Sequence, residues 1–236
     1  MNRLELTGRA STHVIDANDL GCALHRHALA PFRAMRDAAR RAGIDLVAAS
    51  AFRDFDRQRA IWNAKYRGER ALLDAAGRPL PAASLDAAAR VEAILRWTAL
   101  PGASRHHWGT DLDVYDRSAV PADYRLRLEA DEYAVAGVFG TLSTWLDRNM
   151  RRFGFYRPYA SGTCGVGIEP WHLSYAPVAR AATHSLDEAT LAAALQGQGV
   201  LGEEEILRRL PEIHFRYVQA VDRPPRMRAR WARLET

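Results

Sequence analysis

The sequence is poor in lysine and in cysteine. Of its 33 lysine and arginine residues, only Lys65 is a lysine, so nearly all of the positive charge is arginine. The two cysteines, Cys22 and Cys164, are too few for a disulfide-rich scaffold or a four-cysteine zinc site. One disulfide between them is possible, but we expect two free thiols. No apolar run approaches the roughly 20 residues that span a bilayer, which excludes a transmembrane protein.

The balance of charge is only mildly positive. With 28 acidic residues the net charge is +5, and 48% apolar and 26% charged residues are typical of a globular protein of 236 residues. The densest basic run lies near the C-terminus and comprises Arg223, Arg226, Arg228, Arg230 and Arg233, with Trp231 among them. Arginine binds phosphate and tryptophan stacks on bases. No nucleic-acid-binding motif accompanies the run, so we expect no specific nucleic-acid partner.

The N-terminal segment MNRLELTGRASTHVID contains no apolar stretch of signal-peptide length. As written, the chain is therefore expected in the cytoplasm. If a leader has been removed, the periplasm is the alternative.

Helical and strand-like patterns alternate without a regular βαβ rhythm, which indicates an α+β domain. Apolar residues recur at helical spacing over residues 28–42, and residues 44–50 form an apolar run typical of a buried strand. Glycine and proline are frequent over residues 66–83, where we expect a long loop. The remaining predictions are a helix after Arg53, a helix capped by Ser84 and ended by Pro101-Gly102, a strand at 111–115, a helical region at about 123–152, a strand at 171–175 and a helix that begins with a capping box at Ser185–Glu188.

We expect a catalytic domain over residues 1–180 and a helical extension, residues 181–236, that packs on it. In the extension, Ile206, Leu207 and Leu210 indicate an amphipathic helix that stops before Pro211. No motif in the extension distinguishes packing on the domain from a role in oligomerisation, and the oligomeric state stays open.

The segment SRHHWGTDLDVY, residues 104–115, contains two histidines followed by two aspartates. In a strand, Asp111 and Asp113 share one face, while the residues between them face the core. A loop histidine such as His106 can then converge with a strand aspartate on one cation, with Gly109 permitting the turn between them. Histidine and aspartate also mix in ordinary polar loops, so this segment alone does not decide.

The segment IEPWHLSY, residues 168–175, places Glu169 close to His172. Pro170 disfavours a helix at Glu169, which excludes a helical HExxH site. In an extended chain, Trp171 packs in the core and His172 points the other way, as a third metal ligand with Glu169 beside it as a general base. The alternative is an exposed glutamate and a core histidine.

The segment ASAFRDFDRQ, residues 49–58, places Arg53 just after a buried strand. At a sheet edge, an arginine can hold a carboxylate or polarise a carbonyl. Taken alone, Arg53 is better explained as the partner of a surface ion pair, because arginine is common throughout this chain.

Together the three segments read Ser-x2-Arg-x4-Gln, then Ser-x-His-x2-Gly-x3-Asp, then Glu-x-Trp-His. This order and spacing resemble the zinc D-alanyl-D-alanine carboxypeptidases and dipeptidases of the VanY/VanX type, which share their zinc fold with the Hedgehog signalling domain. The resemblance covers about residues 25–180. It implies a small, mostly antiparallel sheet that carries a zinc site and is flanked by helices.

The resemblance also implies a role for each motif residue. It makes Glu169 the catalytic base and Arg53 the residue that stabilises the substrate carbonyl, while Ser104 and Gln58 help to hold the peptide. The ligands that it implies for one Zn²⁺ per chain are His106, Asp113 and His172. Two imidazoles and a carboxylate leave the fourth position of zinc open, as in catalytic sites.

The sequence departs from the family pattern at two places. A small residue is common two positions before the ligand aspartate, where this chain has Asp111, so Asp111 is either a partner of a ligand or an alternative ligand. The aromatic-Arg-Tyr-Pro stretch is scrambled over residues 156–159, and no tyrosine is assigned a role. His107, adjacent to a ligand, is expected to support the site.

The implied function is zinc-dependent hydrolysis at a C-terminal D-alanine of peptidoglycan stem peptides or their precursors. An L,D-carboxypeptidase or an L-alanyl-D-glutamate endopeptidase with the same site is the alternative enzyme, because specificity resides in loops such as residues 66–103. A non-catalytic zinc-binding module is the remaining alternative, although a purely structural site needs neither Glu169 nor Arg53.

Overall fold

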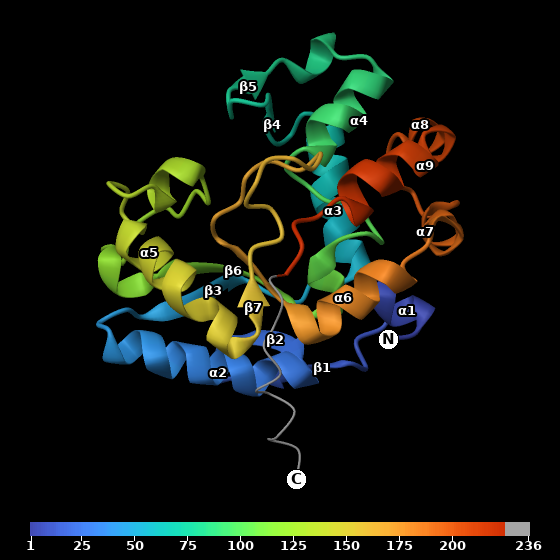
Figure 1. Ribbon diagram of the computed structural model, residues 1–236. Helices are drawn as coiled ribbons and strands as arrows, with labels where there is room; N and C mark the ends of the chain where they lie inside the picture. The colour runs from blue at the N-terminus through green and yellow to red at the C-terminus, as the bar shows by residue number, and fades with distance from the viewer. Residues whose placement is uncertain (225–236) are drawn as a thin grey trace.

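A computed structural model describes residues 1–224 of the chain and shows a four-stranded antiparallel sheet surrounded by helices (Figure 1). The strand order is β3 (Leu46–Ser50), β6 (Asp111–Asp116), β8 (His172–Tyr175) and β7 (Phe155–Tyr156). The predicted α+β class and the small antiparallel sheet are confirmed. Residues 226–233, which hold most of the predicted basic run, lie outside the described part of the chain.

Strand β6 lies inside the sheet, between β3 and β8. Asp113 is in register with Ser50 of β3 on one side and with His172 of β8 on the other. The segment that follows β3 and the first residue of β8 are thereby brought to the same place along β6. This register determines where the three motifs meet.

Helix α2 (Arg26–Arg41) runs along the sheet (Figure 1). Its apolar side, including Phe32, Met35 and Ala39, is fully buried and belongs to the same apolar cluster as Leu112 and Leu173 of the sheet. The predicted helix over residues 28–42 is confirmed with a start two residues earlier. A hairpin of β1 (Val14–Ala17) and β2 (Cys22–His25) precedes it.

A second apolar cluster joins helices from the middle and the end of the chain. Phe55 and Trp62 of α3 share it with Leu191, Ile206 and Ile213 of the C-terminal helices. The helices that contribute are α3 (Phe55–Tyr66), α4 (Ala87–Leu95), α6 (Ala176–Ser185), α7 (Glu188–Leu195), α8 (Glu203–Arg208) and α9 (Leu210–Ile213), followed by a π-helical turn (His214–Gln219). The C-terminal residues thus share a core with the middle of the chain, and the division at residue 180 stays a prediction.

The remaining elements are short. Helix α1 (Arg3–Leu6) lies at the N-terminus, α5 (Gly140–Asn149) precedes β7, and β4 (Leu72–Leu73) pairs with β5 (Pro79–Leu80) inside the predicted loop. No helix among residues 1–224 is long and apolar enough to cross a membrane. Cys22 and Cys164 are free thiols, as predicted.

Two predicted helix starts were wrong by a short distance. Helix α4 begins after Asp86, whose carboxylate accepts a hydrogen bond from the backbone of Ala89, and not after Ser84. Ser185 is the last residue of α6, and Asp187 caps α7. In both places an aspartate near the predicted serine provides the acceptor for the free backbone N–H groups.

The predicted helical region at 123–152 was wrong over its first half. Only Gly140–Asn149 forms an α-helix, and the preceding residues form a loop with a 3₁₀ turn at Ala130–Tyr133. Buried Glu132 organises this loop, because its carboxylate accepts hydrogen bonds from the Tyr124 hydroxyl and from the backbone of Glu129. The predicted helix with Ile206 and Leu207 ends at Arg208, before Pro211 as expected. Leu210 instead begins α9, and Pro211 lies in the first turn of that helix, where it requires no N–H partner.

Candidate metal centre and active site

The sheet register brings Asp113 and His172 together. They are cross-strand partners of the β6–β8 pair, and both side chains are buried. An Asp113 carboxylate oxygen lies 3.4 Å from Nδ1 of His172. The alternation of side chains along β6 places Asp111 on the same face, as the sequence predicted.

His106 reaches the same point from a 3₁₀ turn, Arg105–Trp108, just before β6. Gly109 ends this turn with a φ of +63°, and a Cβ there would lie 2.7 Å from the backbone nitrogen of His25. His106 donates from Nδ1 to the carbonyl of Ala51 at 2.8 Å. Its Nε2 then presents a lone pair toward Asp113, 3.4 Å from a carboxylate oxygen.

These three side chains fit a metal ion. One ligand atom each of His106, Asp113 and His172 lies within 4.8 Å of the others, and no second such group occurs among residues 1–224. Oδ1 of Asp113 is buried and has no hydrogen-bond partner in that part of the chain. Burial raises the pKa of Asp113 to about 6, and Glu169 adds to the effect. A bound cation would give Oδ1 of Asp113 a partner and would offset the free-energy cost of burying the carboxylate.

Asp111 lies behind His172. Its Oδ1 accepts a hydrogen bond from His172 Nε2 at 2.9 Å, which directs Nδ1 toward Asp113. Burial by itself raises the pKa of Asp111, but the charge of Arg105 and the hydrogen bond from His172 hold it well below its ordinary value. Of the two roles left open for Asp111, this geometry favours the partner of a ligand.

Arg105 is the counter-charge of Asp111 and was not singled out in the sequence. Its guanidinium is buried and donates to Asp111 at 2.8 Å. The remaining N–H groups donate to Thr183, Tyr156 and Ser174. Two features of the sequence could have indicated this ion pair: Arg105 directly precedes a ligand histidine, and Asp111 stands where the resemblance implies a small residue.

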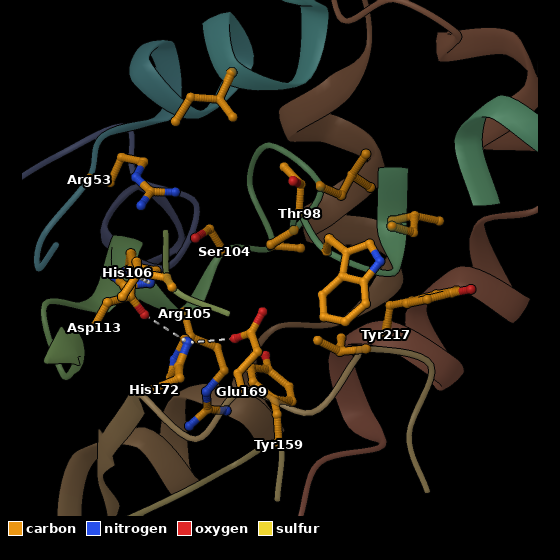
Figure 2. Close-up of a pocket in the computed structure, with 18 of the residues that line it drawn as sticks. Arg53, Thr98, Ser104, Arg105, His106, Asp113, Tyr159, Glu169, His172 and Tyr217 are labelled. Carbon is orange, nitrogen blue, oxygen red and sulfur yellow. Dashed lines mark hydrogen bonds and ion pairs between the residues drawn. The ribbon is translucent and has the colours of Figure 1, made fainter. Parts of the chain in front are cut away.

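Glu169 lies beside the three candidate ligands (Figure 2). Its backbone N–H donates to the carbonyl of Tyr159 at 3.0 Å, which fixes the turn before β8. The carboxylate accepts a hydrogen bond from His172 Nδ1 at 3.0 Å. Burial lowers the pKa of His172, but the hydrogen bonds that the ring donates to Asp111 and Glu169 outweigh this effect and raise the pKa to about 10.

Arg53 follows β3 and faces the same cavity. Its guanidinium donates to the side chains of Gln58 at 2.8 Å and Ser50 at 2.7 Å and forms no ion pair with a carboxylate in the described part of the chain. Gln58 is fully buried and also donates to the carbonyl of Ala99. Because Gln58 does not line the cavity, we interpret it as orienting Arg53, and its predicted contact with a peptide is not supported by this position.

His107 supports the loop that carries Arg53. Its Nδ1 donates to the carbonyl of Arg53 at 2.6 Å, and its Nε2 accepts a hydrogen bond from the backbone of Gly102 at 3.1 Å. Burial lowers the pKa of His107 to about 4, so the ring stays neutral. This agrees with its expected supporting role.

A cavity of about 410 Å³ opens beside the metal-binding group. Its wall includes all of the predicted site residues except Gln58, so Ser104, Arg53 and Glu169 face the same space. The predicted specificity segment contributes Arg70, Leu73, Trp97 and Thr98. Ile213, Tyr217 and Val218 of the C-terminal region also line the cavity, which the sequence did not indicate.

Tyr159 also lines this cavity, although the sequence gave it no role. Its ring packs edge-on against His172, with centroids 5.1 Å apart. Burial, together with the charge of Glu169, raises the pKa of Tyr159 well above its ordinary value. The phenol is therefore a neutral hydrogen-bond donor beside the candidate base.

A family model described as VanY, D-alanyl-D-alanine carboxypeptidase, matches residues 21–178, which include every motif described above. The chain belongs to this family. The match confirms the resemblance derived from the three motifs. The matched region begins at residue 21, slightly before residue 25, where the resemblance was expected to begin.

One curated relative carries the same description as the VanY family, and another is uncharacterized. A D-alanyl-D-alanine carboxypeptidase of Enterococcus faecalis is 31% identical over 142 residues, which are 59% of this chain and 43% of that protein. An uncharacterized protein of Haemophilus influenzae is 36% identical over 121 residues, covering 50% of this chain and 92% of that protein.

Solved VanY structures have the same fold. A vancomycin-resistance D,D-pentapeptidase VanY mutant in complex with Zn(II) aligns with a TM-score of 0.50 and 25% identity, covering 83% of this chain and 90% of that chain. VanYB in complex with D-alanine-D-alanine aligns with a TM-score of 0.51 and 24% identity, covering 84% and 90%. The LdcB LD-carboxypeptidase, at 20% identity and a TM-score of 0.51, shares the fold over 90% of this chain and 81% of its own.

Proposed function

We propose that this protein is a zinc-dependent carboxypeptidase that removes a C-terminal D-alanine from peptidoglycan stem peptides or their precursors. The observation that carries the proposal is the group of His106, Asp113 and His172 with Glu169 at hydrogen-bond distance from it. Membership of the VanY family supplies the substrate class. Zn²⁺ suits two imidazoles and one carboxylate, and when bound it supplies a Lewis acid at the scissile carbonyl.

The side chains of this protein perform the remaining steps. Glu169 is placed to take a proton from the attacking water and to return it to the leaving amine. The Arg53 guanidinium, held by Gln58 and Ser50, is oriented to donate to the oxygen on which negative charge develops. Ser104 and Tyr159 offer further hydroxyl donors along the cavity wall for the peptide backbone.

Retention of both Glu169 and Arg53 in one cavity argues against a non-catalytic zinc module, which would require neither group. The choice of bond depends on the cavity wall. Digesting stem peptides that end in D-Ala-D-Ala, in L-residue-D-Ala or in an intact L-Ala-D-Glu linkage, followed by mass spectrometry, distinguishes the D,D-carboxypeptidase from the L,D-carboxypeptidase and the endopeptidase. We expect loss of one D-alanine from the first peptide.

The decisive variant is Glu169→Gln, which removes the base but keeps the shape of the side chain. We expect it to retain zinc and to lose about 10²- to 10⁴-fold in kcat. Glu204→Gln, an exposed glutamate of α8, is the matched control and should behave as wild type. Undiminished hydrolysis by zinc-loaded Glu169→Gln protein would overturn the mechanism.

A further inference from the structure

The only lysine of the chain lies in the wall of the cavity. Lys65 is in the last turn of α3, and its ammonium donates to the hydroxyl of Thr98 at 2.5 Å. Both residues line the cavity next to the metal-binding group. Within the described residues, no carboxylate lies within ion-pair distance of Lys65.

Two more cations without a carboxylate partner line the same cavity. Arg53 is bonded only to neutral groups, and Arg70, which follows α3, forms no ion pair with any described residue. The other arginines of the wall are neutralised, Arg105 by Asp111 and Arg127 by Glu129 and Asp131. The carboxylates of Asp113 and Glu169 line the same cavity, but among the described residues neither forms an ion pair with Arg53, Lys65 or Arg70. These three cations therefore lack a direct counter-charge.

The partly buried position of Lys65 makes its positive charge unfavourable unless an anion lies beside it. Burial lowers the pKa of Lys65 to about 8, the charge of Arg70 adds to the effect, and the more distant charge of Glu169 opposes it only in part. A cation held away from water without a counter-charge is destabilising, and an anionic ligand removes this cost. The ammonium and the Thr98 hydroxyl together offer the donors that one carboxylate group requires.

The position of Thr98 shows where Lys65 lies relative to the candidate metal ligands, because the two side chains are hydrogen-bonded. Figure 2 shows Thr98 beyond Ser104 as seen from His106, on the side of the cavity opposite Glu169. A peptide with its scissile carbonyl near Arg53 and the metal ligands therefore extends along the wall toward Lys65. A carboxylate elsewhere on the same peptide can reach the ammonium.

We propose that Lys65, bonded to Thr98 and flanked by Arg70, forms a second recognition point in the cavity, which binds a free carboxylate of the peptide substrate. This rests on the proposed peptidase function. Two carboxylates of a stem peptide have this chemistry: the C-terminal one on the leaving residue, and a side-chain one on a residue before the scissile bond. They are distinguished by blocking each in turn.

The test measures peptide binding in zinc-loaded Glu169→Gln protein, which does not consume the ligand. Three synthetic stem peptides are titrated by calorimetry: the free acid, its C-terminal amide, and the peptide with its side-chain carboxylate amidated. With Lys65 present, blocking the carboxylate that binds at Lys65 should weaken binding about 10- to 100-fold, as expected for a hydrogen bond between charged groups. The identity of the weakened peptide assigns the source.

Replacement of the ammonium provides the second half of the test. In the same background, Lys65→Met should weaken the free acid by a similar factor and leave the blocked peptide unchanged. Lys65→Arg should restore most of the discrimination, and Lys65→Gln keeps a donor to Thr98 if the methionine variant fails to fold. Arg57→Met removes an exposed charge of the same helix outside the cavity and is the control.

The outcomes separate the two proposals. If Lys65→Met weakens all three peptides equally, or none of them, the carboxylate subsite is wrong while the peptidase assignment stands. If the zinc-loaded protein with Lys65 intact binds none of the three peptides, the proposed function fails and the subsite fails with it.

Discussion

Nε2 of His172 donates a hydrogen bond to Asp111 at 2.9 Å, and Asp111 is in turn bonded to the buried guanidinium of Arg105. The ring of His172 is therefore held in one orientation by a charged pair on the side away from Asp113. At the position where the family resemblance implies a small residue, this chain has a carboxylate that fixes the orientation of a candidate metal ligand. The pair of Arg105 and Asp111 is best understood as one unit, because without Asp111 the buried guanidinium of Arg105 would have no counter-charge.

Asp111→Asn should weaken zinc binding about 10- to 100-fold, because a neutral amide accepts the His172 hydrogen bond more weakly and no longer raises the basicity of the ring. Competition with a chromophoric chelator measures this affinity. Asp116→Asn, a buried aspartate at the other end of the same strand, is the control and should keep wild-type affinity. Equal zinc affinity in Asp111→Asn and wild type would contradict the role given to Asp111.

His106→Ala should lose most of its zinc on dialysis, because only Asp113 and His172 remain to bind it. Elemental analysis of the dialysed protein gives the metal content per chain. His184→Ala, which removes an exposed histidine of α6, should retain one equivalent. Full zinc content in His106→Ala would show that this histidine is not a ligand.

Arg53→Lys should lower kcat about 10²- to 10³-fold with a smaller change in KM, because the donor is needed mainly when charge develops on the carbonyl oxygen. A lysine also cannot reproduce the two hydrogen bonds to Gln58 and Ser50. Steady-state kinetics on a D-Ala-D-Ala peptide, with zinc content verified, separate the two constants. A rise in KM alone would indicate that Arg53 binds the ground state.

The stability of the protein should fall on mild acidification because of His25. Burial, with repulsion from His13, His27 and Arg26, lowers the pKa of His25 from 6.5 to about 4. The unfolded chain binds this proton more readily, so the contribution to stability is complete above pH 6.5 and is lost as the pH falls toward 4. Between pH 7.5 and pH 5 the loss is about 2 kcal/mol.

His25→Asn isolates this effect, because asparagine retains an acceptor for the backbone N–H of His27 at the start of α2 but does not titrate. Urea unfolding at both pH values measures the difference. The variant should lose about 2 kcal/mol less than wild type on acidification. An identical loss in both proteins would assign the acid sensitivity to other groups.

The metal centre was accessible from the sequence because its determinants are local. His106, Gly109 and Asp113 lie within one turn and one strand, and Glu169 and His172 within another short segment. Strand periodicity placed Asp111 and Asp113 on one face, and the joint order of the three motifs supplied the resemblance that implied the ligands. The same reasoning predicted α2 and the central strands from their apolar patterns. Where two acceptors competed for a helix start, as Ser84 did with Asp86, the pattern alone could not decide.

The rest of the site depends on contacts between distant segments. Tyr159, Tyr217 and Lys65 reach the cavity from three separate parts of the chain, and no local pattern connects them. The packing of Gln58 behind Arg53 likewise depends on the carbonyl of Ala99, far along the sequence. The loop over residues 123–139 was misassigned as helical, because hydrogen bonds to the buried carboxylate of Glu132 hold it in place and a helical apolar stripe does not.

A chain with one lysine has one ε-amine, and here that amine lies in the cavity wall beside the metal-binding group. A pKa of about 8 leaves a useful fraction of Lys65 deprotonated under mildly alkaline conditions. Apart from an N-terminal amine, amine-selective acylating reagents therefore have one target in this sequence, the ε-amine of Lys65. The mass added at residue 65 becomes a covalent footprint of the cavity, strong when it is open and suppressed when a ligand fills it.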